Sequence, residues 1–250
     1  MPILSATHLS LTYPNGNGGL RALDDVSFEI NEGEFVCVVG PSGCGKSSLL
    51  KLLSGLRTPT MGEVIFEGER VHATPEKIAL VFQKANLMPW RTVFDNITLP
   101  LELKNLPDHK KESRAREMID LVGLNGFESS YPRELSGGME QRVAIARALV
   151  QYPDVLLLDE PFGSLDALTR ERMSLELLRI WDRYGKTVIM VTHSISEAVF
   201  LADRVLVFTP RPGSLRAAIK VNLPRPRNLE MTYSKEFGEI ASWVRKEIGD

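Results

Sequence analysis

Two groups of residues in this chain have the types and spacing that phosphate chemistry requires. The first is the run Gly40-Pro41-Ser42-Gly43-Cys44-Gly45-Lys46-Ser47, here called the phosphate loop. Glycine lets several backbone N–H groups approach phosphate oxygens closely, and the N-terminus of a following helix adds positive partial charge. The pattern predicts a nucleotide site in which Lys46 contacts the β- and γ-phosphates and the Ser47 hydroxyl binds Mg²⁺. The alternative is a glycine-rich turn that binds no ligand.

The second group is a pair of carboxylates after the apolar residues 155–158. Asp159 and Glu160 follow this run directly, which is typical of a buried strand that ends at the edge of a sheet. A hard cation prefers oxygen ligands, so we predict that Asp159 is a partner of Mg²⁺. Glu160 is then placed to polarise the attacking water. An Asp-Glu pair on its own is usually just solvated.

Hydrophobic periodicity predicts the strands that must position these groups. Residues 35–39 form an apolar run before the phosphate loop and predict a buried strand, with a helix beginning at Lys46. Apolar residues alternate with polar ones through Leu9, Leu11 and Tyr13, and again over residues 26–30, which predicts two half-buried N-terminal strands. Further strands are predicted at residues 64–66, 79–82, 155–158, 187–191, 205–208 and 217–221.

Helical patterns lie between several of these strands. Residues 95–150 are predicted to be almost entirely helical, most clearly at 112–122 and 139–150. Apolar residues recur at helical spacing from Phe237 to Ile248 and predict an amphipathic helix that docks on its own domain. Strands that alternate with helices indicate an α/β protein with a mainly parallel sheet, preceded by an antiparallel sheet and interrupted by an inserted helical subdomain.

The composition fits a protein with a sizeable core and no general affinity for nucleic acid. The 250 residues are 43% hydrophobic, and 30 basic against 32 acidic residues give a net charge of -2. No apolar run approaches the ~18 residues of a membrane span, and the first residues do not resemble a signal peptide. We expect a cytosolic chain whose two cysteines, Cys37 and Cys44, are reduced thiols.

Four further runs accompany the phosphate loop. They are Leu135-Ser136-Gly137-Gly138-Met139-Glu140-Gln141, Leu157-Leu158-Asp159-Glu160-Pro161, Ser164-Leu165-Asp166 and Thr192-His193. Together they resemble the ATP-binding-cassette ATPases, and the resemblance covers nearly the whole chain. It implies ATP and Mg²⁺ as ligands, ATP hydrolysis as the reaction, and an ABC-type P-loop ATPase core. It also implies one domain over 1–250, with a core of 1–85 and 151–225, a helical subdomain of 86–150 and a C-terminal helix in 226–250.

The resemblance extends the nucleotide site beyond the phosphate loop and Ser48. Ser136, Gly137 and Gly138 would contact the γ-phosphate of ATP held by a second copy, so that the enzyme works as an ATP-sandwich dimer. On their own these residues would be an ordinary helix N-cap. Met139 replaces the glutamine that is commonest in the family at this point, which leaves its side-chain contact open.

Four more residues match family positions. Gln83 would sense Mg²⁺ and the γ-phosphate, and His193 would hydrogen-bond the γ-phosphate and position Glu160. Tyr13 would stack on adenine, although a core aromatic is the alternative. Asp166 would lie at the dimer interface, and it could equally cap the following helix.

A finer resemblance concerns residues 88–97 and 223–227, which look like the nitrate, sulfonate and taurine importer branch. It implies an ATPase subunit that energises import of a small anion, with transmembrane permease subunits and a separate extracytoplasmic substrate-binding protein as partners. Leu87, Met88 and Trp90 would form a groove for a permease helix, or they pack under the helical block. The chain would then lie on the cytoplasmic face of the plasma membrane. The alternatives are a soluble ATPase switch on a cytosolic scaffold and a nucleotide-binding module without hydrolysis.

Overall fold

The computed structural model describes residues 1–14, 19–163 and 165–249. Its contacts divide the chain into two compact units. Unit 1 contains Met1–Pro75 and Lys186–Asp250, and unit 2 is Glu76–Gly185. Each unit carries part of the predicted site.

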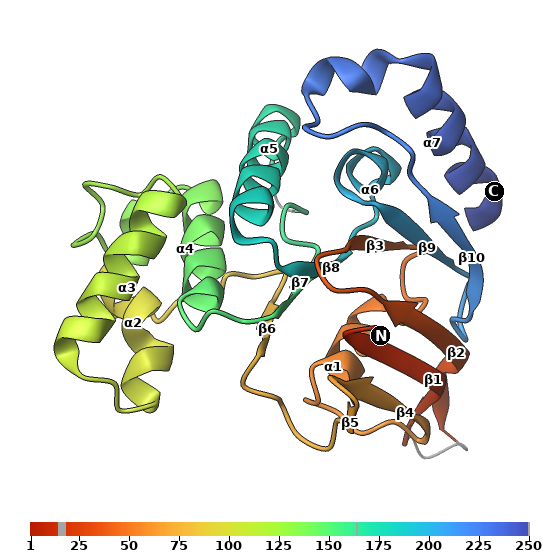
Figure 1. Ribbon diagram of the computed structural model, residues 1–250, viewed down its shortest axis with the longest axis horizontal. Helices are drawn as coiled ribbons and strands as arrows, with labels where there is room; N and C mark the ends of the chain where they lie inside the picture. Colours follow the sequence, from red (N-terminus) through yellow and green to blue (C-terminus); the bar gives the residue numbers. More distant parts are fainter. Residues whose placement is uncertain (15–18, 164, 250) are drawn as a thin grey trace. The chain divides into compact units, whose positions relative to one another are not determined.

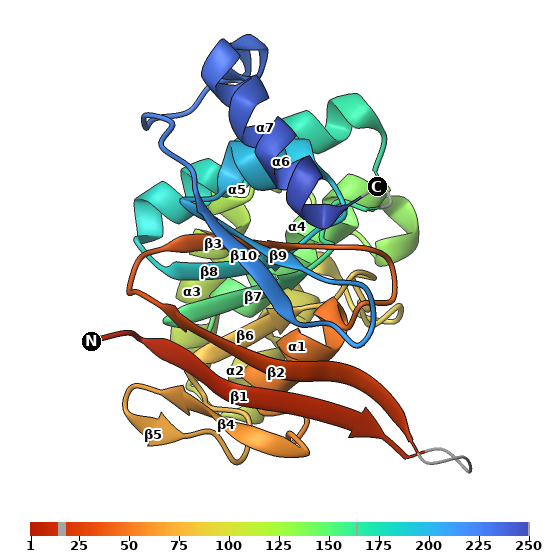
Figure 2. The ribbon, with the colours of Figure 1, turned by 90° about the vertical axis from the view of Figure 1, so that its right-hand side faces the viewer.

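Unit 1 begins with an antiparallel sheet in the strand order β2-β1-β4-β5. Its strands are β1 (Leu4–Tyr13), β2 (Leu20–Ile30), β4 (Met61–Phe66) and β5 (Glu69–Arg70). Leu4 pairs with Ile30 and Leu9 with Val26, and all four side chains are fully buried. The two N-terminal strands predicted from alternation are therefore confirmed, and Figure 2 shows them side by side with β4.

The second sheet of unit 1 is mainly parallel. It contains β3 (Phe35–Val39), β8 (Thr187–Val191), β9 (Arg204–Phe208) and β10 (Leu215–Lys220). β3 pairs in parallel with β8 and β9, whereas β10 is antiparallel to β9. Every residue of β3 and β8 is buried, as expected for parallel strands covered on both faces.

Helices cover this sheet on both faces. α1 (Lys46–Leu53) begins at the predicted residue and lies between the two sheets (Figure 2). α6 (Ile195–Leu201) packs against β3, and α7 (Lys235–Ile248) packs against α6, β9 and β10. A short 3-10 helix, η2 (Leu229–Tyr233), precedes α7. Phe237 and Val244 of α7 are buried, so the amphipathic helix docks on its own unit as predicted.

Unit 2 contains a parallel pair of strands and a group of helices. β6 (Ile78–Val81) pairs with β7 (Val155–Asp159). α2 (Val93–Leu103), α3 (Asp108–Leu121) and α4 (Gly137–Leu149) pack together (Figure 1). Between α3 and α4 lies the 3-10 helix η1 (Pro132–Glu134), and α5 (Ala167–Tyr184) follows β7.

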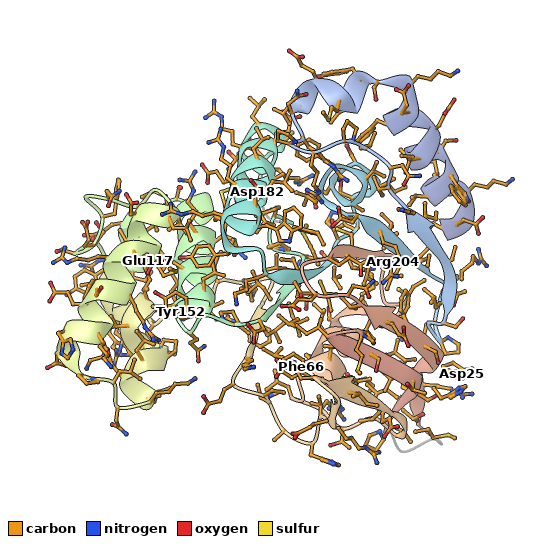
Figure 3. The ribbon with its side chains drawn as sticks, in the orientation of Figure 1. Asp25, Phe66, Glu117, Tyr152, Asp182 and Arg204 are labelled. Atoms are coloured by element: carbon orange, nitrogen blue, oxygen red, sulfur yellow. The ribbon has the colours of Figure 1, made fainter. Side chains whose placement is uncertain are left out.

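One carboxylate connects three segments of unit 2. Glu117 on α3 accepts hydrogen bonds from the hydroxyl of Tyr152, after α4, at 2.5 Å and from that of Tyr184, at the end of α5, at 2.6 Å. Figure 3 labels Glu117 and Tyr152. These bonds hold the pKa of Glu117 below its usual range. Burial raises the pKa of Tyr184, and the hydrogen bond to Glu117 raises it further.

The structure corrects the prediction that residues 95–150 are almost entirely helical. Helices α2, α3 and α4 do lie there, but residues 122–131 form turns. Helix α2 also begins earlier, at Val93, because Thr92 and Asp95 form a reciprocal capping box. Among the described residues, no helix has the length and apolar character needed to cross a membrane. The boundaries predicted for the core, helical subdomain and C-terminal helix stay predictions.

Candidate nucleotide site

The phosphate loop lies between β3 and α1, where the sequence predicted it. Lys46 is only 6% exposed, and its Nζ donates to the carbonyl oxygens of Gly40 at 2.8 Å and Pro41 at 3.0 Å. A buried ammonium needs such partners, because leaving the charge unsatisfied would be costly. The cation is therefore held at the loop, where phosphate oxygens would provide charged acceptors in place of neutral ones.

Three glycines allow the loop to pack closely against neighbouring strands of unit 1. A Cβ on Gly40 would lie 2.9 Å from the carbonyl oxygen of Phe208, and one on Gly45 would lie 2.7 Å from that of Ala22. A Cβ on Gly213, in the connection between β9 and β10, would lie 2.0 Å from the carbonyl oxygen of Cys44. The backbone shape of the loop is therefore fixed by contacts with segments distant in sequence.

Tyr13 lies beside the first turn of α1. Its hydroxyl shares a hydrogen bond of 2.9 Å with the Ser48 hydroxyl. The guanidinium of Arg57 lies over the ring, 4.2 Å from its centroid, which is a cation–π contact. Arg57 could not be identified from the sequence, because nothing in its surroundings marks it as a partner of Tyr13.

The two cysteines are free and buried, in agreement with the expected reduced thiols. Burial raises the pKa of the Cys44 thiol, and the neighbouring Lys46 charge offsets only part of this shift. Burial raises the pKa of Cys37 well above its ordinary value, and Glu197 adds to the effect.

The last predicted residue of unit 1 is His193. It follows β8, which is fully buried, and its own side chain is exposed. Unit 1 thus carries the predicted adenine residue, the phosphate-loop residues with Ser48, and the predicted γ-phosphate histidine.

Unit 2 brings together the predicted carboxylates and Gln83. Asp159 is the last residue of β7, and Glu160 follows it with a positive φ of 44°. Such a backbone conformation costs a residue with a Cβ on the order of 1–3 kcal/mol, and this kind of strain concentrates at functional sites. The side-chain amide of Gln83 donates to Oε2 of Glu160 at 3.4 Å. Gly163 lies next to both side chains, because a Cβ there would be 3.5 Å from Glu160 Oε2 and 3.6 Å from Gln83 Nε2.

Arg147 of α4 is a second residue that the sequence analysis missed. Its guanidinium donates to the carbonyl oxygens of Asn86 at 3.0 Å and Ala85 at 2.7 Å. Burial lowers its pKa. Arg147 therefore links the loop after Gln83 to the helix that begins with the Ser-Gly-Gly run.

The exposed N-terminus of α4 contains the predicted γ-phosphate contacts. Ser136 is the N-cap, and its hydroxyl accepts from the backbone N–H of Met139 at 3.3 Å. Ser136 and Gly137 are exposed, whereas Gly138 is buried. The N-cap alternative thus holds, and a helix N-terminus that faces solvent also suits an anion.

Asp166 is the N-cap of α5, and its Oδ1 accepts from the backbone N–H of Thr169 at 3.1 Å. Hydrogen bonding from the Thr169 side chain, and then from its backbone N–H, holds the pKa of Asp166 below its ordinary value. The capping alternative is therefore confirmed, and its interface role stays a prediction. Ser164, of the same run, lies outside the described residues.

The donor set predicted for Mg²⁺ fits that ion. Ser47 supplies a hydroxyl, Gln83 an amide oxygen and Asp159 a carboxylate, and all three are oxygen donors of the kind that Mg²⁺ accepts beside water and phosphate. The set contains no soft ligand that would favour a transition metal.

A buried strand, a glycine-rich phosphate loop and a helix that begins at its lysine define a P-loop nucleotide-binding protein. The comparisons with known proteins identify the family within this class. The family model described as ABC transporter matches residues 23–163. The chain belongs to the ABC transporter family, and it is an ATP-hydrolysing subunit.

Three curated relatives match almost end to end. The chain is 43% identical over 245 residues to the aliphatic sulfonates import ATP-binding protein SsuB of Bacillus cereus, with 98% of this chain and 95% of the relative covered. It is 44% identical to the nitrate import ATP-binding protein NrtD of Synechocystis sp., with coverage of 97% and 95%. It is 45% identical to the taurine import ATP-binding protein TauB of Rhizobium johnstonii, again with coverage of 97% and 95%.

A solved structure supports both the fold and the reaction. It is a dimeric post-hydrolysis state of an ATP-binding cassette bound to ADP and Pi. The match has a TM-score of 0.78 and 34% identity, and covers 88% of this chain and 100% of the other. The predicted fold class, an ABC-type core with an antiparallel sheet and a helical part, is confirmed.

Proposed function

We propose that this chain is the subunit that energises an ABC importer for a small anion of the sulfonate, taurine or nitrate class. The observation that carries the proposal is the similarity, over almost the whole chain, to import ATP-binding proteins for these anions. The same similarity favours a membrane-bound importer over a soluble switch. The anion itself would be selected by other subunits, so its class rests on the relatives.

Hydrolysis is assigned to residues of both units. Lys46 would exchange its loop carbonyls for β- and γ-phosphate oxygens, and the exposed imidazole of His193 would donate to the γ-phosphate. Glu160 would take the proton of the attacking water, with Gln83 bonded to its carboxylate. Mg²⁺, bound by Ser47, Gln83 and Asp159, would neutralise phosphate charge. Tyr13 would hold the adenine.

A second copy would complete each site. The exposed N-terminus of α4, with the Ser136 hydroxyl and the N–H groups of Gly137 and Gly138, is chemically suited to a γ-phosphate. This helix N-terminus would bind the γ-phosphate of the ATP molecule that the partner copy holds. Asp166 would lie at the same dimer interface.

The permease would dock on the loop after Gln83. Trp90 in this loop is 72% exposed, and Leu87 and Met88 beside it are partly exposed. Exposed tryptophan and methionine are typical of adaptable contact surfaces. The chain would thereby lie on the cytoplasmic face of the plasma membrane, and an extracytoplasmic binding protein would deliver the anion to the permease.

Co-purification from native membranes tests this proposal. Tagged Glu160→Gln protein would be isolated from detergent-solubilised membranes with ATP present, and its partners identified. Recovery of a multi-span permease supports the importer, and recovery of soluble proteins alone overturns it.

A matched pair of tryptophan variants tests the docking surface in the same experiment. Trp243 on α7 is also exposed, at 52%, and lies away from the loop in sequence. Trp90→Ala should lose the permease, whereas Trp243→Ala should retain it. Equal recovery with both variants would contradict the docking surface.

A further inference from the structure

The segment of residues 223–227, here called the strap, has no role in the assignments above. It follows β10 and contains two arginines, Arg225 and Arg227, each directly after a proline. Arg227 is only 7% exposed, an unusual position for an arginine. The strap belongs to unit 1, as do β8 and His193.

Both arginines donate to the end of α6. Arg227 Nη1 donates to the carbonyl oxygens of Val199 at 3.0 Å and Phe200 at 2.8 Å. Arg225 Nη2 donates to the carbonyl oxygen of Leu201 at 2.9 Å. The last carbonyls of a helix lack partners within it, and a cation there is favourable. The strap therefore supplies partners for three consecutive carbonyls of a short helix, which would be marginal on its own.

The other end of α6 holds the backbone on both sides of His193. Thr192 Oγ1 donates to Oε2 of Glu197 at 2.6 Å, and this carboxylate lies on α6. The backbone N–H of Ser194 donates to Thr192 Oγ1 at 3.0 Å, and Ser194 caps the helix through the N–H of Glu197. The residues before and after His193 are thus both bonded to α6, so a shift of this helix moves the histidine.

Arg227 is a poor candidate for a purely stabilising residue. Its Nε and Nη2 are buried and have no hydrogen-bond partner among the described residues. Buried polar atoms without partners cost stability, which offsets the gain from the two carbonyl contacts. Burial lowers the pKa of Arg227 to about 10, so the side chain still carries its charge at neutral pH.

The other groups that face this region of unit 1 belong to β3, α6 and β9. Asp203, directly before β9, accepts from Arg225 Nε at 2.9 Å and from the backbone N–H of Phe35 at 2.9 Å. Phe35 begins β3, the strand that leads to the phosphate loop. The strap is therefore bonded to the end of α6 and, through Asp203, to the start of β3.

We propose that Arg227 is a positioning residue for His193, which acts by fixing α6 at its C-terminal end. The proposal rests on the assignment of His193 to the γ-phosphate. Arg227 is bonded to the end of α6 that lies away from His193 in sequence, so its effect should fall on turnover and leave ATP binding unchanged.

The test compares ATP hydrolysis and ATP affinity in matched variants. Arg227→Met keeps the length of the side chain and removes the donors, and kcat should fall ~10-fold or more, since small misplacements of a catalytic group have effects of this order. The Kd for ATP should stay within ~2-fold of wild type. Arg227→Lys, which retains the charge and can still donate, should recover part of the turnover. Arg216→Met is the control, because Arg216 makes an analogous contact at the end of α7, to the carbonyl oxygen of Glu247.

A double variant separates positioning from general damage. In the His193→Ala background, Arg227→Met should cause no further loss of kcat, because both changes act on one group. If the losses of kcat from the two changes multiply in the double variant, the proposal is overturned. Normal turnover by a folded Arg227→Met protein would also overturn it. If Arg227→Met does not fold by circular dichroism, Arg227→Lys carries the same double-variant test. Wild-type turnover by His193→Ala would instead refute the proposed role of His193, so the two failures are distinct.

Discussion

Gln83 and Glu160 share a hydrogen bond of 3.4 Å between the amide nitrogen of the first and Oε2 of the second. They are 77 residues apart in sequence, and the pairing of β6 with β7 brings them together. One of these residues is predicted to sense Mg²⁺ and the other to polarise water. The bond therefore gives the proposed metal sensor a direct effect on the orientation of the proposed base.

Glu160→Gln should bind ATP and hydrolyse it at least ~10²-fold more slowly, because an amide of nearly the same size cannot accept the proton of water. Phosphate release and equilibrium ATP binding measure the two effects separately. Glu171→Gln, an exposed position on α5, is the matched control and should turn over normally. Near-normal hydrolysis by Glu160→Gln would remove this residue from the mechanism.

Ser136→Arg should abolish ATP-dependent dimerisation, because it adds a long charged side chain at the proposed γ-phosphate seat. ATP binding to each copy should be unchanged. Light scattering coupled to size exclusion, in the Glu160→Gln background with ATP, reports the dimer directly. Ser113→Arg, an exposed serine on α3, should still dimerise. A dimer of normal strength with Ser136→Arg would contradict the ATP-sandwich model.

Gly213→Ala should destabilise unit 1 by about 1–3 kcal/mol and weaken nucleotide binding, since its methyl group would overlap the carbonyl of Cys44. Gly238→Ala is the control, because a Cβ in that helical position meets nothing within 4 Å. It should instead stabilise α7 by about 0.5–1 kcal/mol. Thermal unfolding with and without ATP measures the stability of each variant and its stabilisation by nucleotide. Equal melting temperatures for the two variants would argue against the close packing of the loop.

Alkylation of Cys44 should be slow at pH 7 and should accelerate steadily as the pH rises toward the raised pKa of the thiol. Burial raises its pKa, so the reactive thiolate is scarce below that raised value, and its fraction grows ~10-fold per pH unit until the pKa is reached. Bound ATP should slow the reaction further. Mass spectrometry after iodoacetamide treatment at pH 7 and pH 9 measures the rate, and Cys37 provides the internal control. Rapid labelling of Cys44 at pH 7 would contradict the buried, neutral thiol.

The sequence predicted the elements that depend on local signals. The strand before the phosphate loop, the helix from Lys46 and the strand before Asp159 lie where periodicity and glycine spacing placed them. The turns at residues 122–131 contain turn-forming residues, among them Gly123, Asn125 and Gly126. They were missed because the prediction followed the helical periodicity on either side of them. The start of α2 depended on a capping box at Thr92 that hydrophobic periodicity does not report.

The site residues that the sequence did not reveal are mostly arginines. Arg147 reaches carbonyl groups 61 and 62 positions away, and Arg227 reaches carbonyls 27 and 28 positions away. A guanidinium that binds backbone carbonyls requires no particular residue type at the other end. Such contacts therefore leave no pattern in the chain, and only the folded structure identifies them.

The two carbonyl contacts of Lys46 also bear on how the site empties. If Lys46 holds phosphate as proposed, its ammonium has neutral partners within hydrogen-bonding distance, at Gly40 and Pro41, once phosphate leaves. Departure of the product therefore leaves no buried cation without a partner, which would otherwise hold ADP in place. A phosphate loop whose own carbonyl oxygens accept hydrogen bonds from its lysine can release its product in every cycle, as repeated transport requires.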